Sequence, residues 1–137
     1  MKRTLQIILF VLSLIPLRTV VRGLIVGSSW GAVDDAFLID FESHYRYLSA
    51  VYISITLTLW WVIPNIEKHT VPLRIVAFAV FLGGVNRLIS IFAVGIPSTE
   101  PIVWLILELV APFILLAMHE TIRVKDKQEP EQILQSA

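Results

Sequence analysis

The chain has 137 residues, of which 56% are hydrophobic and 16% are charged, and its mean hydropathy is +0.78. Its eleven basic and eleven acidic residues cancel, which excludes the strong positive field of a nucleic-acid-binding protein. The absence of cysteine excludes disulfides, thiolate catalysis, covalent haem attachment and cysteine-ligated metal centres. The length allows one domain. Because the apolar residues come in long blocks, they predict membrane spans rather than a soluble core.

Four apolar segments are long enough to cross a bilayer as helices, at ~1.5 Å of rise per residue and a hydrocarbon core of ~30 Å. These predicted spans cover approximately residues 5–26, 45–63, 73–94 and 101–118. The first follows Lys2 and Arg3 as a signal peptide would, but no small-residue cleavage site follows it, so we expect a retained span. The predicted fold class is all-α, an integral membrane antiparallel four-helix bundle over residues 1–120.

The segments outside the spans are also informative. Gly23, Gly27 and Gly31 recur at every fourth residue, a spacing at which another backbone can approach closely. Residues 28–44 mix apolar and acidic side chains, so we expect part of this loop to lie at the membrane interface or over the mouth of the bundle. Residues 121–137 are polar and charged, and we predict a disordered cytoplasmic tail there.

The distribution of basic residues predicts the orientation in the membrane. Lysine and arginine flank the spans near both termini and at the 65–72 turn, as Lys2, Arg3, Lys68, Arg74, Arg123, Lys125 and Lys127. The 23–45 loop and the 95–100 turn contain neither residue type. Because short cytoplasmic segments are enriched in lysine and arginine, both termini are predicted to lie in the cytoplasm.

Charged side chains inside the spans fall at one predicted depth. From the helical rise, Arg18 and Arg87 lie ~20 Å and ~21 Å above the cytoplasmic ends of their spans, and Glu108 lies ~10 Å below the outer end of its span. In a ~30 Å core these levels coincide. Arg22 lies one turn further out than Arg18 on the same face, and Arg46 opens the second span. A charge at such depth is costly and therefore marks a candidate functional site.

We therefore predict a polar cluster in the outer half of the bundle, either ligand-binding or structural. Its members are Arg18, Arg22, Glu42, Arg46, Asn86, Arg87 and Glu108, with Asp40, His44, Tyr47 and Ser90 as secondary candidates. Arginine stays charged, so these side chains must meet carboxylates, carbonyls, water or an anionic ligand. If the loop acids pair with Arg46 and Arg22, the cluster is a closed structural network. If they do not, it has spare donors for a carboxylate, a phosphate or a quinone-like carbonyl.

Several other kinds of site find no support in the sequence. The histidines His44, His69 and His119 lie far apart in depth, so we expect no metal site. No nucleotide-binding or hydrolase motif is present, and we expect no cofactor. Nothing supports an enzyme, because no nucleophile stands out and Glu108 is the only deep acid. A transporter would need a polar pathway or an internal half-repeat, and the sequence contains neither.

Three stretches carry a family resemblance: DFESHYRYLSAVY (40–52), GGVNRLISIFAVGIP (83–97) and LELVAP (107–112). They resemble the bacterial family called domain of unknown function 4345. The resemblance implies a small four-span protein of the bacterial inner (plasma) membrane, with no function assigned. Its polar residues would be Glu42, Arg46, Arg87 and Glu108, with Asn86 and Gly84 beside them. More distantly, the layout is similar to DoxX-like four-helix membrane proteins, some linked to quinone or thiol redox chemistry.

Two functions remain open at this point. The first is a small module that binds a lipid-like, isoprenoid or quinone ligand entering from the bilayer, with Arg46 and Arg87 as anchors. The alternative is an accessory or scaffolding subunit of a membrane complex, in which the charge cluster only holds the helices together. Its partner would be another membrane protein or a second copy of this chain.

Overall fold

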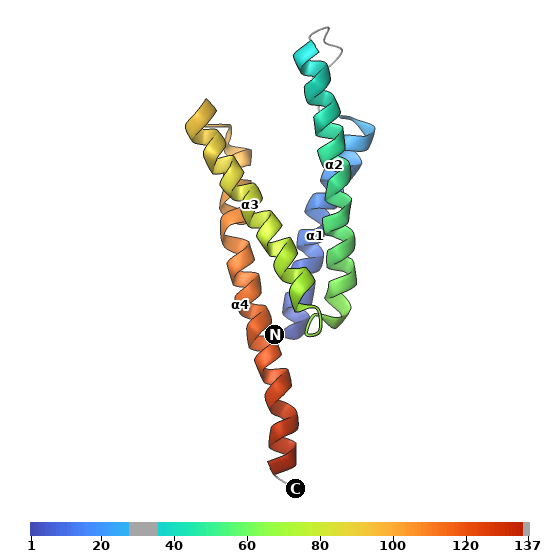
Figure 1. Cartoon of the computed structure of the whole chain (residues 1–137), viewed down its shortest axis with the longest axis vertical. Coiled ribbons are helices and arrows are strands. Elements are labelled where there is room, and N and C mark those ends of the chain that lie inside the picture. The colour runs from blue at the N-terminus through green and yellow to red at the C-terminus, as the bar shows by residue number, and fades with distance from the viewer. Residues whose placement is uncertain (28–35, 136–137) are drawn as a thin grey trace. The chain divides into compact units, whose positions relative to one another are not determined.

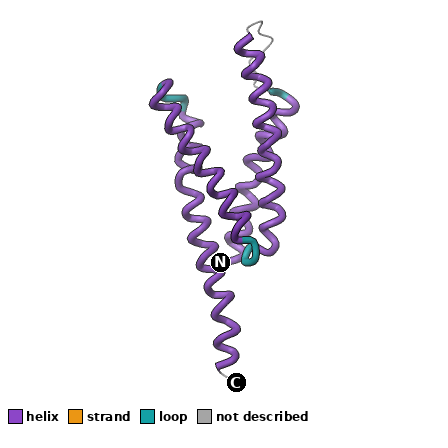
Figure 2. The backbone as a smooth tube through the Cα atoms, viewed as in Figure 1, coloured by secondary structure: helices purple, strands orange, loops and turns teal. Residues whose placement is uncertain are grey.

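The described chain is helical apart from short connections (Figures 1 and 2). A computed structural model describes the backbone of residues 1–27 and 36–135, and the side chains of residues 1–27 and 39–124. Its elements are α1 (Lys2–Ile25), α2 (Ala36–Val62), the short 3-10 helix η1 (Ile63–Asn65), α3 (Thr70–Val94) and α4 (Thr99–Gln135). The predicted loop residue Gly31 lies outside the described residues.

Each long helix contains a stretch that is long and apolar enough to cross a bilayer. These stretches are Lys2–Ile25, Ile39–Asn65, Thr70–Val94 and Thr99–Val124. Large apolar side chains cover their outer surfaces, and Phe92 and Val94 are 83% and 87% exposed. Such surfaces are stable in lipid because helices satisfy their own backbone hydrogen bonds. The protein is therefore a multi-pass membrane protein with four candidate spans.

Two helices extend beyond the predicted spans. α2 begins at Ala36, inside the stretch that was predicted to be a loop up to residue 44. No glycine or proline occurs between Gly31 and Pro64, so nothing in the sequence interrupts helix before η1. α4 continues to Gln135, through most of the segment predicted to be disordered. That segment contains three Gln, two Lys and two Glu residues, which favour helix.

The chain divides into two compact units. One unit is Ile7–Pro64, which contains most of α1 and all of α2. The other combines Met1–Gln6 with the chain from Asn65 onward, and it contains α3 and α4.

Small and hydroxyl-bearing residues form the contact between α1 and α2. Trp60 donates a hydrogen bond from Nε1 to Ser13 Oγ at 2.9 Å, and Gly23 lies against Ser49. The earlier α1 residue, Ser13, contacts the later α2 residue, Trp60, and the later α1 residue, Gly23, contacts the earlier Ser49, so the two helices are antiparallel. Without a hydrophobic driving force between helices in lipid, such close approaches and polar contacts hold helices together.

α3 and α4 form the second antiparallel pair (Figure 1). Phe81 and Phe113 meet edge to face, with ring centroids 5.3 Å apart. Gly84 is buried against Leu109 and Glu108, where an added Cβ would lie 3.0–3.1 Å from their side chains. The predicted fold class is thus confirmed: the chain is all-helical, with four long apolar helices that pack antiparallel within each pair.

A charged surface surrounds the 65–69 connection at the start of α3. Lys2 Nζ lies 2.9 Å from Glu67 Oε2, and Arg74 pairs with Glu120, which also pairs with Arg123. The ion-paired hydrogen bond from Lys2, helped by Lys68, lowers the pKa of Glu67 below 4.5, although partial burial opposes the shift.

We expect Gly23→Ala to destabilise the contact between α1 and α2. A Cβ at this position would lie 2.2 Å from Ser49 Cβ, so one helix must move. Overpacking of this kind costs about 1–3 kcal/mol. Thermal unfolding of the purified protein measures the effect, with Gly83→Ala as the matched control because its nearest neighbour, Glu108 Oε2, is 3.9 Å away. Equal melting temperatures for the two variants would contradict this packing.

The lowered pKa of Glu67 predicts a pH dependence. Because the folded pKa is depressed, the Lys2–Glu67 pair stabilises the protein above the ordinary glutamate pKa of 4.5 and loses this effect as the pH falls through the folded value. The difference in melting temperature between wild type and Glu67→Gln should therefore shrink as the pH is lowered. Since Lys2 is half exposed, the whole effect should not exceed about 1 kcal/mol. A pH-independent difference would refute it.

Candidate functional site

The first pair of predicted site residues joins the end of α1 to the start of α2. Arg46 Nε lies 2.7 Å from Glu42 Oε1, one turn earlier on α2. Arg46 Nη1 also donates to the carbonyl oxygen of Leu24 at 3.0 Å. Carbonyls in the last turn of a helix lack intrahelical donors, and a cation there is favoured by the helix dipole. Arg46 therefore caps α1 while it neutralises Glu42.

Gly27 makes this capping arrangement possible. Its φ of +72° lies in the left-handed region, which glycine adopts without strain. An added Cβ would lie 2.0 Å from Glu42 Oε1 and 2.6 Å from Arg46 Nη2. The glycine spacing in the sequence thus marks two close approaches, one at Gly23 and one at Gly27.

The second pair links α3 to α4 inside the spans. Arg87 Nε lies 2.7 Å from Glu108 Oε2, and the two side chains are 42% and 21% exposed. The pair sits next to Gly84, where the two helices approach closely. A cation and an anion in contact avoid the cost of an isolated charge at membrane depth. The Arg87–Glu108 pair is therefore neutral overall and holds its helix pair together.

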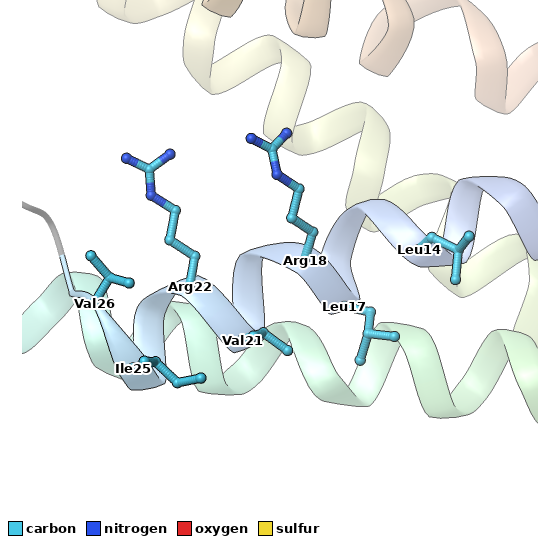
Figure 3. Close-up of a pocket in the computed structure, with 7 residues that line it drawn as sticks. All are labelled: Leu14, Leu17, Arg18, Val21, Arg22, Ile25 and Val26. Carbon is cyan, nitrogen blue, oxygen red and sulfur yellow. The ribbon is translucent and has the colours of Figure 1, made fainter.

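Arg18 and Arg22 differ from the other two arginines. Both are exposed on α1, and neither side chain forms an ion pair or hydrogen bond in the part of the chain that the structure describes. Figure 3 shows their guanidinium groups extending in the same direction, one helical turn apart. They border an open hollow of about 490 Å³ along one side of α1. Its lining residues are Leu14, Leu17, Arg18, Val21, Arg22, Ile25 and Val26.

The remaining predicted site residues do not join either pair. Asn86 and Ser90 are exposed on α3, and Tyr47 is exposed on α2. Asp40 and His44 contact each other on α2, where His44 Nδ1 lies 2.9 Å from the Asp40 carbonyl oxygen. Among the described side chains, no group of three histidine, aspartate or glutamate residues could hold a metal ion.

His119 is fully buried, a packing role that its place at the predicted cytoplasmic end of a span did not indicate. Its Nε2 donates to the Ile66 carbonyl oxygen at 2.8 Å, which ties the 65–69 connection to α4. The sequence did contain a signal for this role, because apolar Leu105 and Pro112 precede it at intervals of seven residues, and both prove to be buried. Residues seven apart lie on the same helix face, so this spacing indicates the packed side of α4.

We expect Glu108→Gln to destabilise the protein, because it leaves Arg87 charged and unpaired within a span. Insertion scales put that cost at up to about 3 kcal/mol. The double variant Arg87→Leu/Glu108→Leu should recover most of the loss, because it removes both charges. Thermal unfolding compares both variants with wild type, with Glu100→Gln, at the exposed start of α4, as the control. A Glu108→Gln variant as stable as wild type would show that the pair contributes nothing.

The paired residues lie within a segment that matches a known family. Residues 4–119 match the family model described as Domain of unknown function (DUF4345). Searches of curated proteins and of solved structures found no match. The match includes Glu42, Arg46, Arg87 and Glu108, and it confirms the resemblance seen in the sequence. Because it covers most of the 137 residues, the chain belongs to the DUF4345 family.

Proposed function

We propose that this four-span membrane protein binds a lipid-like ligand from the bilayer, with Arg18 and Arg22 as its anchors. One observation carries the proposal. These two arginines lie on a membrane-spanning helix, are exposed, and have no ion-pair partner in the described chain. Arginine remains protonated at any relevant pH, so it cannot escape the membrane cost by losing its charge. A ligand with a polar head and an apolar tail would contact the charged guanidinium groups with its head and the apolar surface of the span with its tail.

The ion pairs determine which arginines can act as anchors. The sequence favoured Arg46 and Arg87, but each of these is already in contact with a carboxylate. A ligand there would have to displace Glu42 or Glu108. Arg18 and Arg22 need no such exchange, because among the described side chains nothing neutralises them. Lipids, isoprenoids and quinones all combine an apolar chain with a polar head and belong to the proposed ligand class.

The alternative function is an accessory or scaffolding subunit of a membrane complex. The Glu42–Arg46 and Arg87–Glu108 pairs favour it, since both stabilise contacts between helices of this chain. In that case Arg18 and Arg22 would meet acidic groups of another membrane protein or of a second copy of this chain.

We further propose that the protein lies in the bacterial inner membrane with both termini in the cytoplasm. Lysine and arginine concentrate near the N-terminus, at the start of α3 and after the fourth span, as Lys2, Arg3, Lys68, Arg74 and Arg123. The 95–98 connection contains neither residue type. This asymmetry is the pattern expected of cytoplasmic and outer loops, respectively.

Native mass spectrometry of the full-length protein, extracted gently from its own membrane, tests the proposed function. We expect one small molecule bound to wild type and lost from Arg18→Ala/Arg22→Ala. Arg3→Ala is the matched control, since it removes an exposed arginine at the other end of α1. Retention of the molecule by the double variant, or its loss from the control, would contradict the proposal. A bound protein chain in place of a small molecule would support the accessory-subunit function.

A further inference from the structure

The two exposed arginines form one row on α1. Arg18 and Arg22 extend from one side of α1, and Leu17, Val21 and Ile25 lie on its other side (Figure 3). Residues four apart on a helix have Cβ atoms about 6 Å from each other. Two guanidinium groups that start so close together and extend in one direction can reach the same small group of atoms.

The charge of the site narrows the ligand class. Two arginines bring two positive charges, and among the described side chains no carboxylate compensates either of them. A quinone carbonyl carries no charge, so both cations would remain uncompensated in the membrane. A carboxylate carries one negative charge and two oxygens. A phosphate monoester carries about −1.5 to −2 charges at neutral pH and has three acceptor oxygens, which can accept from both forks.

The apolar part of the hollow offers a surface for an apolar chain attached to the phosphate. From Val26 to Leu14 the hollow follows α1 over a length of ~18 Å at the helical rise. Leu17 and Leu14 lie one and four residues before Arg18, so the hollow continues past the two arginines toward the middle of the span. At the helical rise it reaches ~6 Å deeper than Arg18, whereas Val21, Ile25 and Val26 lie level with the arginines or nearer the end of the helix. A free phosphate would make no use of the deeper part, whereas a lipid would.

We infer that the ligand is a lipid ending in a phosphate monoester, held jointly by Arg18 and Arg22 with its apolar chain along Leu17 and Leu14. This inference rests on the proposed function and specifies its head group. Each guanidinium donates to phosphate oxygens in the fork geometry that suits phosphate. The class includes phosphatidic acids and isoprenoid monophosphates, which share the head group and differ in the chain.

The experiment measures lipid retention by native mass spectrometry on the full-length protein. Dioleoylphosphatidic acid is the main probe, and dioleoylphosphatidylglycerol, dioleoylglycerol, oleate, ubiquinone and glycerol 3-phosphate are compared at the same concentration. We expect at least tenfold stronger retention of phosphatidic acid than of each other probe. Arg18→Gln/Arg22→Gln should retain phosphatidic acid at least tenfold less strongly than wild type. Arg18→Lys/Arg22→Lys should show intermediate retention, because lysine keeps the charge but lacks the forked guanidinium. Arg3→Gln, the control, should retain phosphatidic acid as wild type does.

The possible outcomes separate this inference from the proposed function. Equal retention of phosphatidic acid and phosphatidylglycerol, or of glycerol 3-phosphate and the phosphate lipid, would overturn the inference. If oleate or ubiquinone is retained through Arg18 and Arg22 while phosphatidic acid is not, the inference fails and the proposed function stands. If no probe depends on the two arginines, both fail. Circular dichroism of the glutamine variant shows that its helices are intact, and a single Arg22→Gln variant replaces it if they are not.

Discussion

The cost of placing a charge in an apolar membrane span constrains this structure more than any other single interaction. Arg87 and Glu108 meet that cost by pairing across α3 and α4, and Glu42 and Arg46 meet it at the junction of α1 and α2. In both places a glycine lies beside the pair: Gly84 against Glu108, and Gly27 against Glu42 and Arg46. The glycines remove side-chain volume where the charged groups must approach. Charge pairing and close packing therefore depend on the same few positions of the chain.

The contacts between helices follow from the membrane environment as well. Apolar side chains gain little by leaving lipid for the helix contact, so small and polar residues carry the association. Ser13 and Trp60 hydrogen-bond across α1 and α2, and His119 binds the Ile66 carbonyl within the other unit. The largest apolar side chains, such as Phe92, remain on the outside. Apolar side chains thus occupy the outer surface as well as the interior, as the long apolar blocks of the sequence indicated.

The sequence predicted the depth of side chains along each helix better than their direction around the helix axis. The helical rise brought Arg87 and Glu108 to one level, and the structure pairs them. It did not reveal that His119 faces inward, because depth along a helix says nothing about the direction of a side chain around the axis. Pairing of a loop acid with Arg46 was one of two alternatives, but its form as an i,i+4 pair within one helix was not foreseen, because the predicted span began at residue 45. Aspartates 34 and 35, also in the predicted loop, lie outside the described residues.

The face that α1 turns toward α2 determines which of its side chains remain exposed at the proposed site. The buried residues in the second half of α1 and just after it recur three or four positions apart, as Ser13, Pro16, Val20, Gly23 and Gly27. Ser13, Gly23 and Gly27 of this row lie against α2. Arg18 and Arg22 fall outside that row, so the packing that holds Gly23 against Ser49 also leaves both arginines exposed. Turning them inward would place bulky charged groups where the helices leave no room for a single methyl. The same small residues that join α1 to α2 therefore leave Arg18 and Arg22 exposed, without a carboxylate partner among the described side chains. This combination of a tight helix contact and two exposed cations favours the proposed ligand over an internal network at Arg18 and Arg22.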